Sequence, residues 1–151
     1  MKRILFVVLS SLVVALTMNA QTLSGNKIID EMLKDADSVT AAWEAELEKQ
    51  GIKSELSAYY DSEKNQYVQS YRLFNQEIFN IVDAEKSLSD TISGMVAVMA
   101  ENNSENILVW IGNEFKRTNT GMRVEWLCGN RKKTASATAD EILETIYKMF
   151  Q

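Results

Sequence analysis

The only cysteine of the chain, Cys128, has the most reactive side chain, because a thiolate is both a nucleophile and a metal ligand. A lowered thiol pKa requires a nearby base, cation or helix N-terminus, and Arg131 faces Cys128 if residues 122–137 form a hairpin. The chain has no histidine, however, which excludes Ser-His and Cys-His catalysis and His-ligated metals. Cys128 also continues the apolar alternation of Val124 and Trp126, so we expect a buried structural cysteine.

A second pattern with a chemical interpretation is a run of oxygen-bearing side chains. Asp61, Glu63 and Asn65 stand at every second position, as ligands do in calcium loops. An EF-hand also requires Gly at its sixth position and Glu at its twelfth, where this chain has Gln66 and Arg72. We therefore expect a solvated hairpin turn.

Glu44 and Glu48 lie one helical turn apart, and paired carboxylates perform acid–base chemistry where burial separates their pKa values. Both lie off the apolar stripe of their predicted helix, so we expect a solvated helix face. The sequence thus predicts no catalytic residue, no cofactor site and no metal site, and it predicts that the protein is not an enzyme.

Four tyrosines crowd one predicted hairpin and are the best candidates for contact with a partner: Tyr59, Tyr60, Tyr67 and Tyr71. Adjacent residues of a strand face opposite ways, so Tyr59 and Tyr60 cannot both enter one core. Tyr67 and Tyr71 share a face. We expect Tyr59, Tyr67 and Tyr71 to offer an exposed surface suited to peptide or sugar contact, with ordinary cross-strand packing as the alternative.

Two further groups have both a structural and a binding interpretation. Met95 and Met99 are expected to fill the core and not to line a binding groove. Arg131, Lys132 and Lys133 resemble a patch for an anionic ligand, but charged residues also protect the edge strands of sheets. We expect the second role for this basic trio.

Residues 1–20 have the pattern of a secretory signal peptide. Lys2 and Arg3 precede an apolar run over 4–16, and the segment ends in the small residue Ala20. The run is too short for a comfortable membrane span. The pattern resembles signals of the Bacteroidota type, and no cysteine stands at the cleavage site for a lipid anchor. We therefore expect a secreted or periplasmic protein without a membrane span after cleavage.

Removal of this segment makes the chain more acidic. It takes away two of the 16 basic residues and none of the 21 acidic ones, which leaves 14 against 21 and a net charge of −7. This charge argues against nucleic acid and anionic lipid as partners. The remaining residues, 21–151, have the length of a single domain. One cysteine excludes an internal disulfide, and the oligomeric state does not follow from the sequence.

Three segments have apolar residues at every third or fourth position, which predicts amphipathic helices. They are residues 26–50, 83–102 and 138–150. Asn26 is the expected N-cap of the first helix, and Gly51 is the residue expected to end it. Thr138 and Glu141 form a capping box at the start of the last helix.

Segment 104–120 is ambiguous, because its β-prone run at 107–111 also fits one face of a helix. Ser104 is a good N-cap and Gly121 is a good terminating residue. These end signals agree with the helical period, so we predict a helix.

Two hairpins are predicted, at 52–74 and 122–137, from β-prone runs around short turns. Around a turn at Gly129 and Asn130, the predicted pairs are Val124 with Ala135, Trp126 with Lys133, and Cys128 with Arg131. Residues 75–82 are expected to be irregular, with Phe79 and Ile81 reaching the core from a loop. The fold class is therefore α+β, in the order α-β-β-α-α-β-β-α. We expect a four-stranded antiparallel sheet from two hairpins, with helices on one face.

The arrangement resembles small secreted bacterial domains of unknown function. In those domains a long helix precedes a tyrosine-rich hairpin, here YYDSEKNQYVQSYRL, followed by one or two helices and a final hairpin. The resemblance covers residues 26–137 and implies an architecture and a location, but no site residues. The pattern is also similar to the cone-shaped folds of nuclear-transport-factor-2-like proteins. The terminal helix and the helix at 104–120 depart from that second pattern.

These observations lead to two functional hypotheses. The first is an exported, non-enzymatic domain that binds a protein, a peptide or an envelope component. The second is a domain with a small-molecule pocket of the nuclear-transport-factor-2-like kind. A hydrolase that uses carboxylates alone would need two acids converging in a cleft, and the sequence shows no sign of them.

Overall fold

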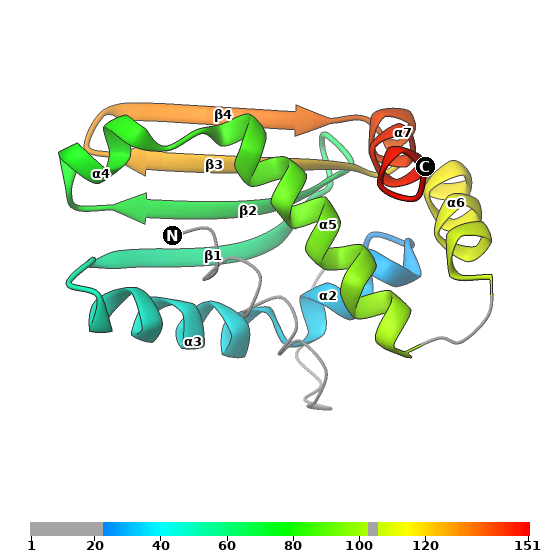
Figure 1. Ribbon diagram of the computed structural model, residues 1–151, viewed down its shortest axis with the longest axis horizontal. Coiled ribbons are helices and arrows are strands. Elements are labelled where there is room, and N and C mark those ends of the chain that lie inside the picture. Colours follow the sequence, from blue (N-terminus) through cyan, green and yellow to red (C-terminus); the bar gives the residue numbers. More distant parts are fainter. Residues whose placement is uncertain (1–22, 103–105) are drawn as a thin grey trace.

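Four strands form one mixed sheet in the order β1-β2-β3-β4. The computed structural model describes residues 23–102 and 106–151. The strands are β1 (Ser54–Asp61), β2 (Gln66–Leu73), β3 (Gly121–Cys128) and β4 (Arg131–Ala137). β1 and β2 form one antiparallel hairpin, and β3 and β4 form the other, as predicted. The hairpins join side by side through β2 and β3 (Figure 1).

The two central strands, β2 and β3, run parallel, so the prediction of a purely antiparallel sheet is wrong. The cause is the long connection between the hairpins. Its main helix, α5 (Ala84–Asn102), crosses the face of the sheet and returns the chain toward the end at which β2 begins (Figure 1). β3 therefore starts at Gly121, beside Gln66, and follows the direction of β2. Parallel neighbours need such a crossover.

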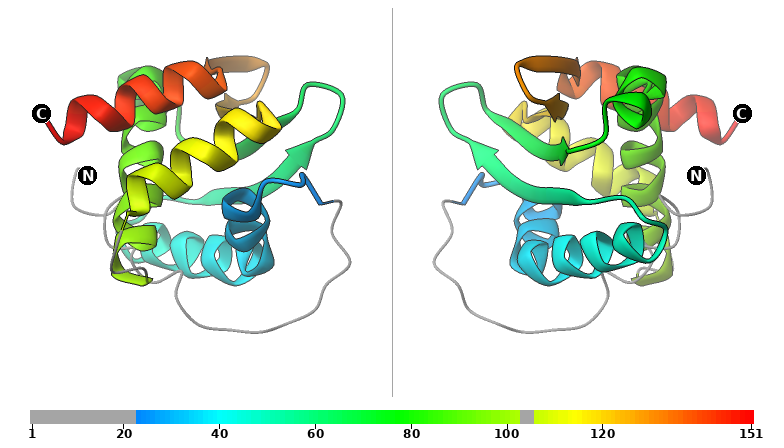
Figure 2. Two further views of the ribbon diagram at one scale, coloured as in Figure 1. Left: turned by 90° about the vertical axis from the view of Figure 1, so that its right-hand side faces the viewer. Right: turned by 90° about the vertical axis from the view of Figure 1, so that its left-hand side faces the viewer.

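Six helices accompany the sheet in the described ranges. They are α2 (Lys27–Lys34), α3 (Ala36–Lys49), α4 (Gln76–Ile81), α5 (Ala84–Asn102), α6 (Ile107–Thr118) and α7 (Ala139–Met149). They lie against one face of the sheet or across one end of it (Figure 2). Within the part of the chain that the structure describes, no helix covers the opposite face. We call this opposite side the open face of the sheet.

The predicted first helix is divided in two at Asp35, which has non-helical dihedral angles. The Asn26 side chain caps α2 as predicted, by accepting hydrogen bonds from two backbone amides of the first turn. Gly51 follows α3 with φ +76°, the conformation expected of a residue that ends a helix. The break lets α2 pack four apolar side chains into the core while α3 runs along β1.

The connection after β2 contains a short helix, α4, where an irregular segment was predicted. Asn75 caps it by accepting hydrogen bonds from the amides of Glu77 and Ile78. Phe79 reaches the core as predicted, with only 1% of its surface exposed, but Ile81 is 69% exposed. One turn of helix directs these two side chains to opposite sides, which a loop prediction does not anticipate.

The helical prediction for 104–120 is confirmed by α6, although its ends differ from the predicted ones. Ser104 lies outside the described residues. Asn119, with φ +52°, is the C-terminal cap, and Gly121 instead begins β3. A Cβ atom on Gly121 would lie 2.8 Å from the Ala137 carbonyl oxygen, so close strand packing explains this glycine. The capping box of α7, from Thr138 and Glu141, is present as predicted.

The β3–β4 hairpin has the predicted register, with the three expected cross-strand pairs. Gly129 occupies the turn with φ +56°. Val124 and Cys128 face the core, at 0% and 6% exposure, and Trp126 on the same face is half-buried. The inward face predicted for this strand is therefore the correct one.

The basic residues of β4 have specific partners. Lys133 Nζ donates to the carbonyl oxygens of Phe79, Asn80 and Val82, at 2.8, 3.0 and 2.8 Å, and so holds the C-terminal end of α4. Arg131 donates to the Asn80 side chain at 2.6 Å. Both cations also lie 5.0 Å from the centre of the Phe79 ring. The basic residues of β4 thus attach α4 to the sheet, in addition to protecting its edge.

The main core lies between the helices and the covered face of the sheet. Met95 and Met99 belong to it, as predicted. The predicted signal peptide, residues 1–20, lies outside the described residues. Within those residues, no helix has the length and apolar character that crossing a membrane requires.

Candidate functional site

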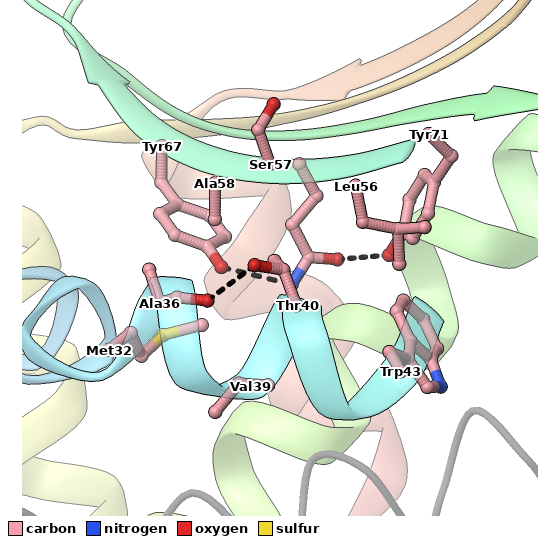
Figure 3. A pocket seen from close by; sticks show the side chains of 11 residues that line it. Met32, Ala36, Val39, Thr40, Trp43, Leu56, Ser57, Ala58, Tyr67 and Tyr71 are labelled. Carbon is pink, nitrogen blue, oxygen red and sulfur yellow. Dashed lines mark hydrogen bonds between the residues drawn. The ribbon is translucent and has the colours of Figure 1, made fainter. Parts of the chain in front are cut away.

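A pocket lies between α3 and the covered face of the β1–β2 hairpin (Figure 3). We call it the α3 pocket. Its lining residues are Met32, Ala36, Val39, Thr40, Trp43, Leu56, Ser57, Ala58, Tyr67, Gln69 and Tyr71. None of these described side chains carries a charge, and most are apolar. The cavity volume is about 30 Å³, enough for about two water molecules.

An aromatic stack forms one wall of the α3 pocket. The Tyr71 ring lies between two tryptophans, Trp43 of α3 and Trp126 of β3. Its centre is 5.1 Å from that of Trp43 in an edge-to-face arrangement, and 4.2 Å from that of Trp126 in a stacked one. The indole nitrogen of Trp126 donates to the Ser87 hydroxyl at 3.1 Å. The stack therefore connects α3, the sheet and α5 through one tyrosine.

A polar network centred on Gln69 forms the floor of the α3 pocket. Its Oε1 accepts from the Tyr71 hydroxyl at 2.5 Å and lies 3.0 Å from Thr91 Oγ1, and its Nε2 donates to the Tyr67 hydroxyl at 2.9 Å. A separation of 2.5 Å is typical of O–H···O and too short for N–H···O. The amide oxygen of Gln69 therefore faces Tyr71, and the amide nitrogen faces Tyr67.

Burial changes the acidity of both phenols in this network. Loss of hydration raises the pKa of Tyr67 to about 12, against an opposing effect of its hydrogen bond with Gln69. Burial likewise raises the pKa of Tyr71 well above its ordinary value, and the neighbouring Tyr67 adds to the shift. Both side chains are therefore neutral hydroxyl groups at physiological pH.

The roof of the α3 pocket, helix α3, packs along β1. Ala36 and Trp43 are the buried residues of α3. Glu44 Oε1 accepts a hydrogen bond from the Leu56 amide at 2.6 Å, which occupies one backbone donor on the outer edge of β1. At the start of α3, Asp35 Oδ1 is buried without a hydrogen-bond partner in the described structure. Val39 and Leu47 are only partly buried but also pack against the core, so the contact with the sheet runs along the helix.

The predicted tyrosine surface is not formed. Tyr67 and Tyr71 are only 3% and 2% exposed, so the expectation that they face solvent is wrong. Strand alternation placed them on a common face, but that face is the one covered by helices. Tyr59 is 41% exposed and lies on the open face of the sheet, as Arg123 does. The three candidates therefore occupy two opposite sides of the sheet.

The open face carries an ion-pair network around Arg123. Its guanidinium lies 3.2 Å from an Asp61 carboxylate oxygen and 3.1 Å from Glu125, which also pairs with Lys132 at 3.2 Å. Hydrogen bonds from the Lys64 amide and from Arg123 hold the pKa of Asp61 below its ordinary value. Opposite charges are thus matched on this side of the sheet.

The remaining sequence candidates have structural partners. Asp61 Oδ1 accepts from the amides of Glu63 and Lys64, which forms the expected turn. Cys128 is buried, and its sulfur lies 3.7 Å from the side-chain oxygen of Gln76. Within residues 23–102 and 106–151, no three or more acidic, cysteine or histidine side chains are grouped so that they could bind a metal ion.

A second hollow, between α5 and α7, is wider than the α3 pocket, at about 280 Å³. It is more polar, and two of its three acidic lining residues have local partners. Glu141 belongs to the capping box of α7, and Glu144 pairs with Lys148 at 2.7 Å. We therefore favour the α3 pocket, where buried polar groups retain bonding capacity in an apolar setting, although it is the smaller of the two.

Gln69, Thr91 and Thr40 are polar site residues that sequence reasoning missed. Gln69 stands two residues from Tyr67 and from Tyr71, so alternation places all three side chains on one face. A polar side chain between two inward tyrosines was the available signal. Thr91 precedes Ile92 on the apolar face of α5 and is 0% exposed.

No protein-family model, curated protein or solved structure matches this chain.

Proposed function

We propose that this protein is an exported, non-enzymatic binding domain that recognises a peptide segment of a partner protein. One side chain of the peptide enters the α3 pocket. The observation that carries the proposal is a small apolar cavity whose floor contains buried, neutral hydrogen-bonding groups. Such a cavity is suited to the anchor residue of an interface, where a few buried side chains contribute most of the binding energy.

The size of the α3 pocket supports a peptide over a free small molecule. Ligand pockets for small molecules generally have volumes of roughly 300–1,000 Å³, and this cavity has about 30 Å³. A ligand with only a few atoms is limited to about −1.5 kcal/mol per non-hydrogen atom. Tight binding therefore requires a larger molecule, most of which lies outside the cavity.

A small-molecule pocket is the second candidate function, and the attachment of α3 favours it. The helix begins at the break at Asp35, and only Ala36 and Trp43 among its residues are fully buried. An outward shift of α3 would enlarge the cavity beneath it. This alternative predicts that a larger ligand displaces α3, whereas the peptide proposal leaves the helix in place.

The peptide proposal is tested by filling the cavity. The Ala58 side chain points into the α3 pocket. Ser57 also belongs to the lining, but its side chain points away from the cavity to the open face (Figure 3). In a selection from a random peptide library, the mature domain should enrich a set of related peptides. The variant Ala58→Leu should lose them, and the matched control Ser57→Leu should retain them.

Circular dichroism and thermal melts establish that both variants are folded. Enrichment of the same peptides by Ala58→Leu, or no enrichment by the wild-type domain, would contradict the proposal.

A further inference from the structure

We propose that the group entering the α3 pocket is a carboxamide, the side-chain amide of asparagine or glutamine in the bound peptide. This inference rests on the proposed function and specifies the chemistry of the same cavity. It follows from counting the hydrogen-bonding capacity that remains free on the floor and roof of the cavity.

Two donors remain on the floor. The amide nitrogen of Gln69 has two hydrogens, and among the described residues only the Tyr67 hydroxyl accepts one of them. The Tyr67 hydroxyl accepts that bond, and its own hydrogen has no acceptor within the described structure. Both groups belong to buried or half-buried side chains that line the cavity. They are suited to one acceptor oxygen, such as a carbonyl.

One acceptor remains on the roof. The Thr40 hydroxyl donates its hydrogen within α3, to the Ala36 carbonyl oxygen at 2.8 Å. Its lone pairs stay available, and Thr40 Oγ1 points into the cavity (Figure 3). It can accept a hydrogen bond from an N–H group. Two donors on one side and one acceptor on the other match the oxygen and nitrogen of a carboxamide.

The apolar lining determines the charge of the preferred group. None of the lining side chains described by the structure is acidic or basic. A carboxylate or an ammonium group would therefore lose its hydration without gaining a counter-ion, which strongly disfavours it. A purely apolar group would leave the Gln69 and Tyr67 donors unsatisfied. A neutral amide avoids both penalties.

Three isosteric probes test this inference on the mature protein: acetamide, acetate and acetamidinium. Nuclear magnetic resonance titrations that follow the methyl groups of Val39 and Ala58 report occupancy of the cavity. We expect acetamide to bind at millimolar concentration and at least about tenfold more tightly than either ion. The reason is that an ion buried in this cavity would have no counter-ion. Equal binding of acetate or acetamidinium, or no binding of acetamide, would overturn the inference.

Single-residue variants identify the groups responsible. Tyr67→Phe removes one donor and Thr40→Val removes the acceptor, and each should weaken acetamide binding by about 3- to 10-fold. Tyr59→Phe and Thr134→Val make the same changes on the open face and should leave binding unchanged. Unchanged binding in both pocket variants would overturn the inference.

A separate experiment tests whether the amide that enters the cavity belongs to a peptide side chain. Peptides selected by the domain should share an asparagine or glutamine, and its replacement by aspartate or glutamate should abolish binding. Selected peptides that depend on Ala58 but need no amide would overturn this inference and leave the proposed function intact. Tighter binding of N-acetylglucosamine than of acetamide would also overturn it, because the amide would then come from a sugar.

Discussion

Tyr71 shows how a single residue connects the parts of this molecule. Its ring contacts Trp43 and Trp126, and its hydroxyl bonds to Gln69. The side chain was a candidate for an exposed surface because strand alternation places it on the same face as Tyr67, and one face of a hairpin can point away from the core. A strand pattern identifies which residues share a face, but not which face the helices cover.

The buried phenols predict a loss of stability at alkaline pH. Burial raises the pKa of Tyr67 from 10.0 to about 12, so the folded state keeps a proton that the unfolded state releases between these values. This contribution to stability is intact below pH 10 and is lost as the pH rises toward 12. Denaturant melts at increasing pH should show the decrease, and Tyr67→Phe should reduce it. An equally steep decrease in that variant would contradict the assignment.

We predict that replacing Trp126 lowers the stability of the protein strongly, although the side chain is only half-buried. Its ring stacks on Tyr71, and its nitrogen bonds to Ser87. Trp126→Ala should lower the free energy of unfolding by about 3 kcal/mol, as measured in a denaturant melt. Leu127→Ala, at the adjacent half-buried position on the open face, should have a clearly smaller effect. Equal losses in the two variants would mean that the stack adds little.

At the scale of secondary-structure elements, α3 is the element that positions the candidate site. Only Ala36 and Trp43 are buried, and Glu44 bonds to the Leu56 amide. Sequence periodicity predicted the helix but joined it to α2, because the apolar stripe continues through Asp35. The turn at Asp35 depends on how two helices fit different partners, which a local pattern does not contain.

We predict that replacing Glu44 loosens α3 locally. Glu44→Ala removes a hydrogen bond between a carboxylate and a buried strand edge, which should cost about 1.5 kcal/mol. Hydrogen exchange should become faster at the Leu56 amide and along α3, while the β3–β4 hairpin stays protected. Glu48→Ala, one turn further along the exposed side, serves as the control. Equal exchange in the two variants would contradict this role for Glu44.

At the scale of the whole molecule, two hairpins are joined by a helical crossover into one mixed sheet. Local rules predicted the Asn26 cap, the Thr138 capping box and the register that pairs Trp126 with Lys133. They did not predict the parallel pairing of β2 with β3, because the crossover that sets it spans almost fifty residues. The site was missed for the same reason, since α3 and Gln69 meet only in the assembled fold.

The arrangement of helices gives the sheet two chemically different sides. The covered face contains the core and the α3 pocket, whose free hydrogen-bonding groups are Tyr67, Gln69 and Thr40. The open face contains Tyr59 and the charges paired around Arg123. Side chains of adjacent β1 residues therefore lie on opposite faces of the sheet. Ala58 and Ser57 consequently form a matched pair, because a substitution at each affects one face only.

The most direct test of the central claim is the affinity of a selected peptide for the wild-type domain and for these two variants, measured by isothermal titration calorimetry. If the α3 pocket holds the anchor residue, Ala58→Leu should raise the dissociation constant about tenfold or more, and Ser57→Leu should leave it unchanged. An unchanged dissociation constant in a folded Ala58→Leu variant would show that the peptide binds elsewhere.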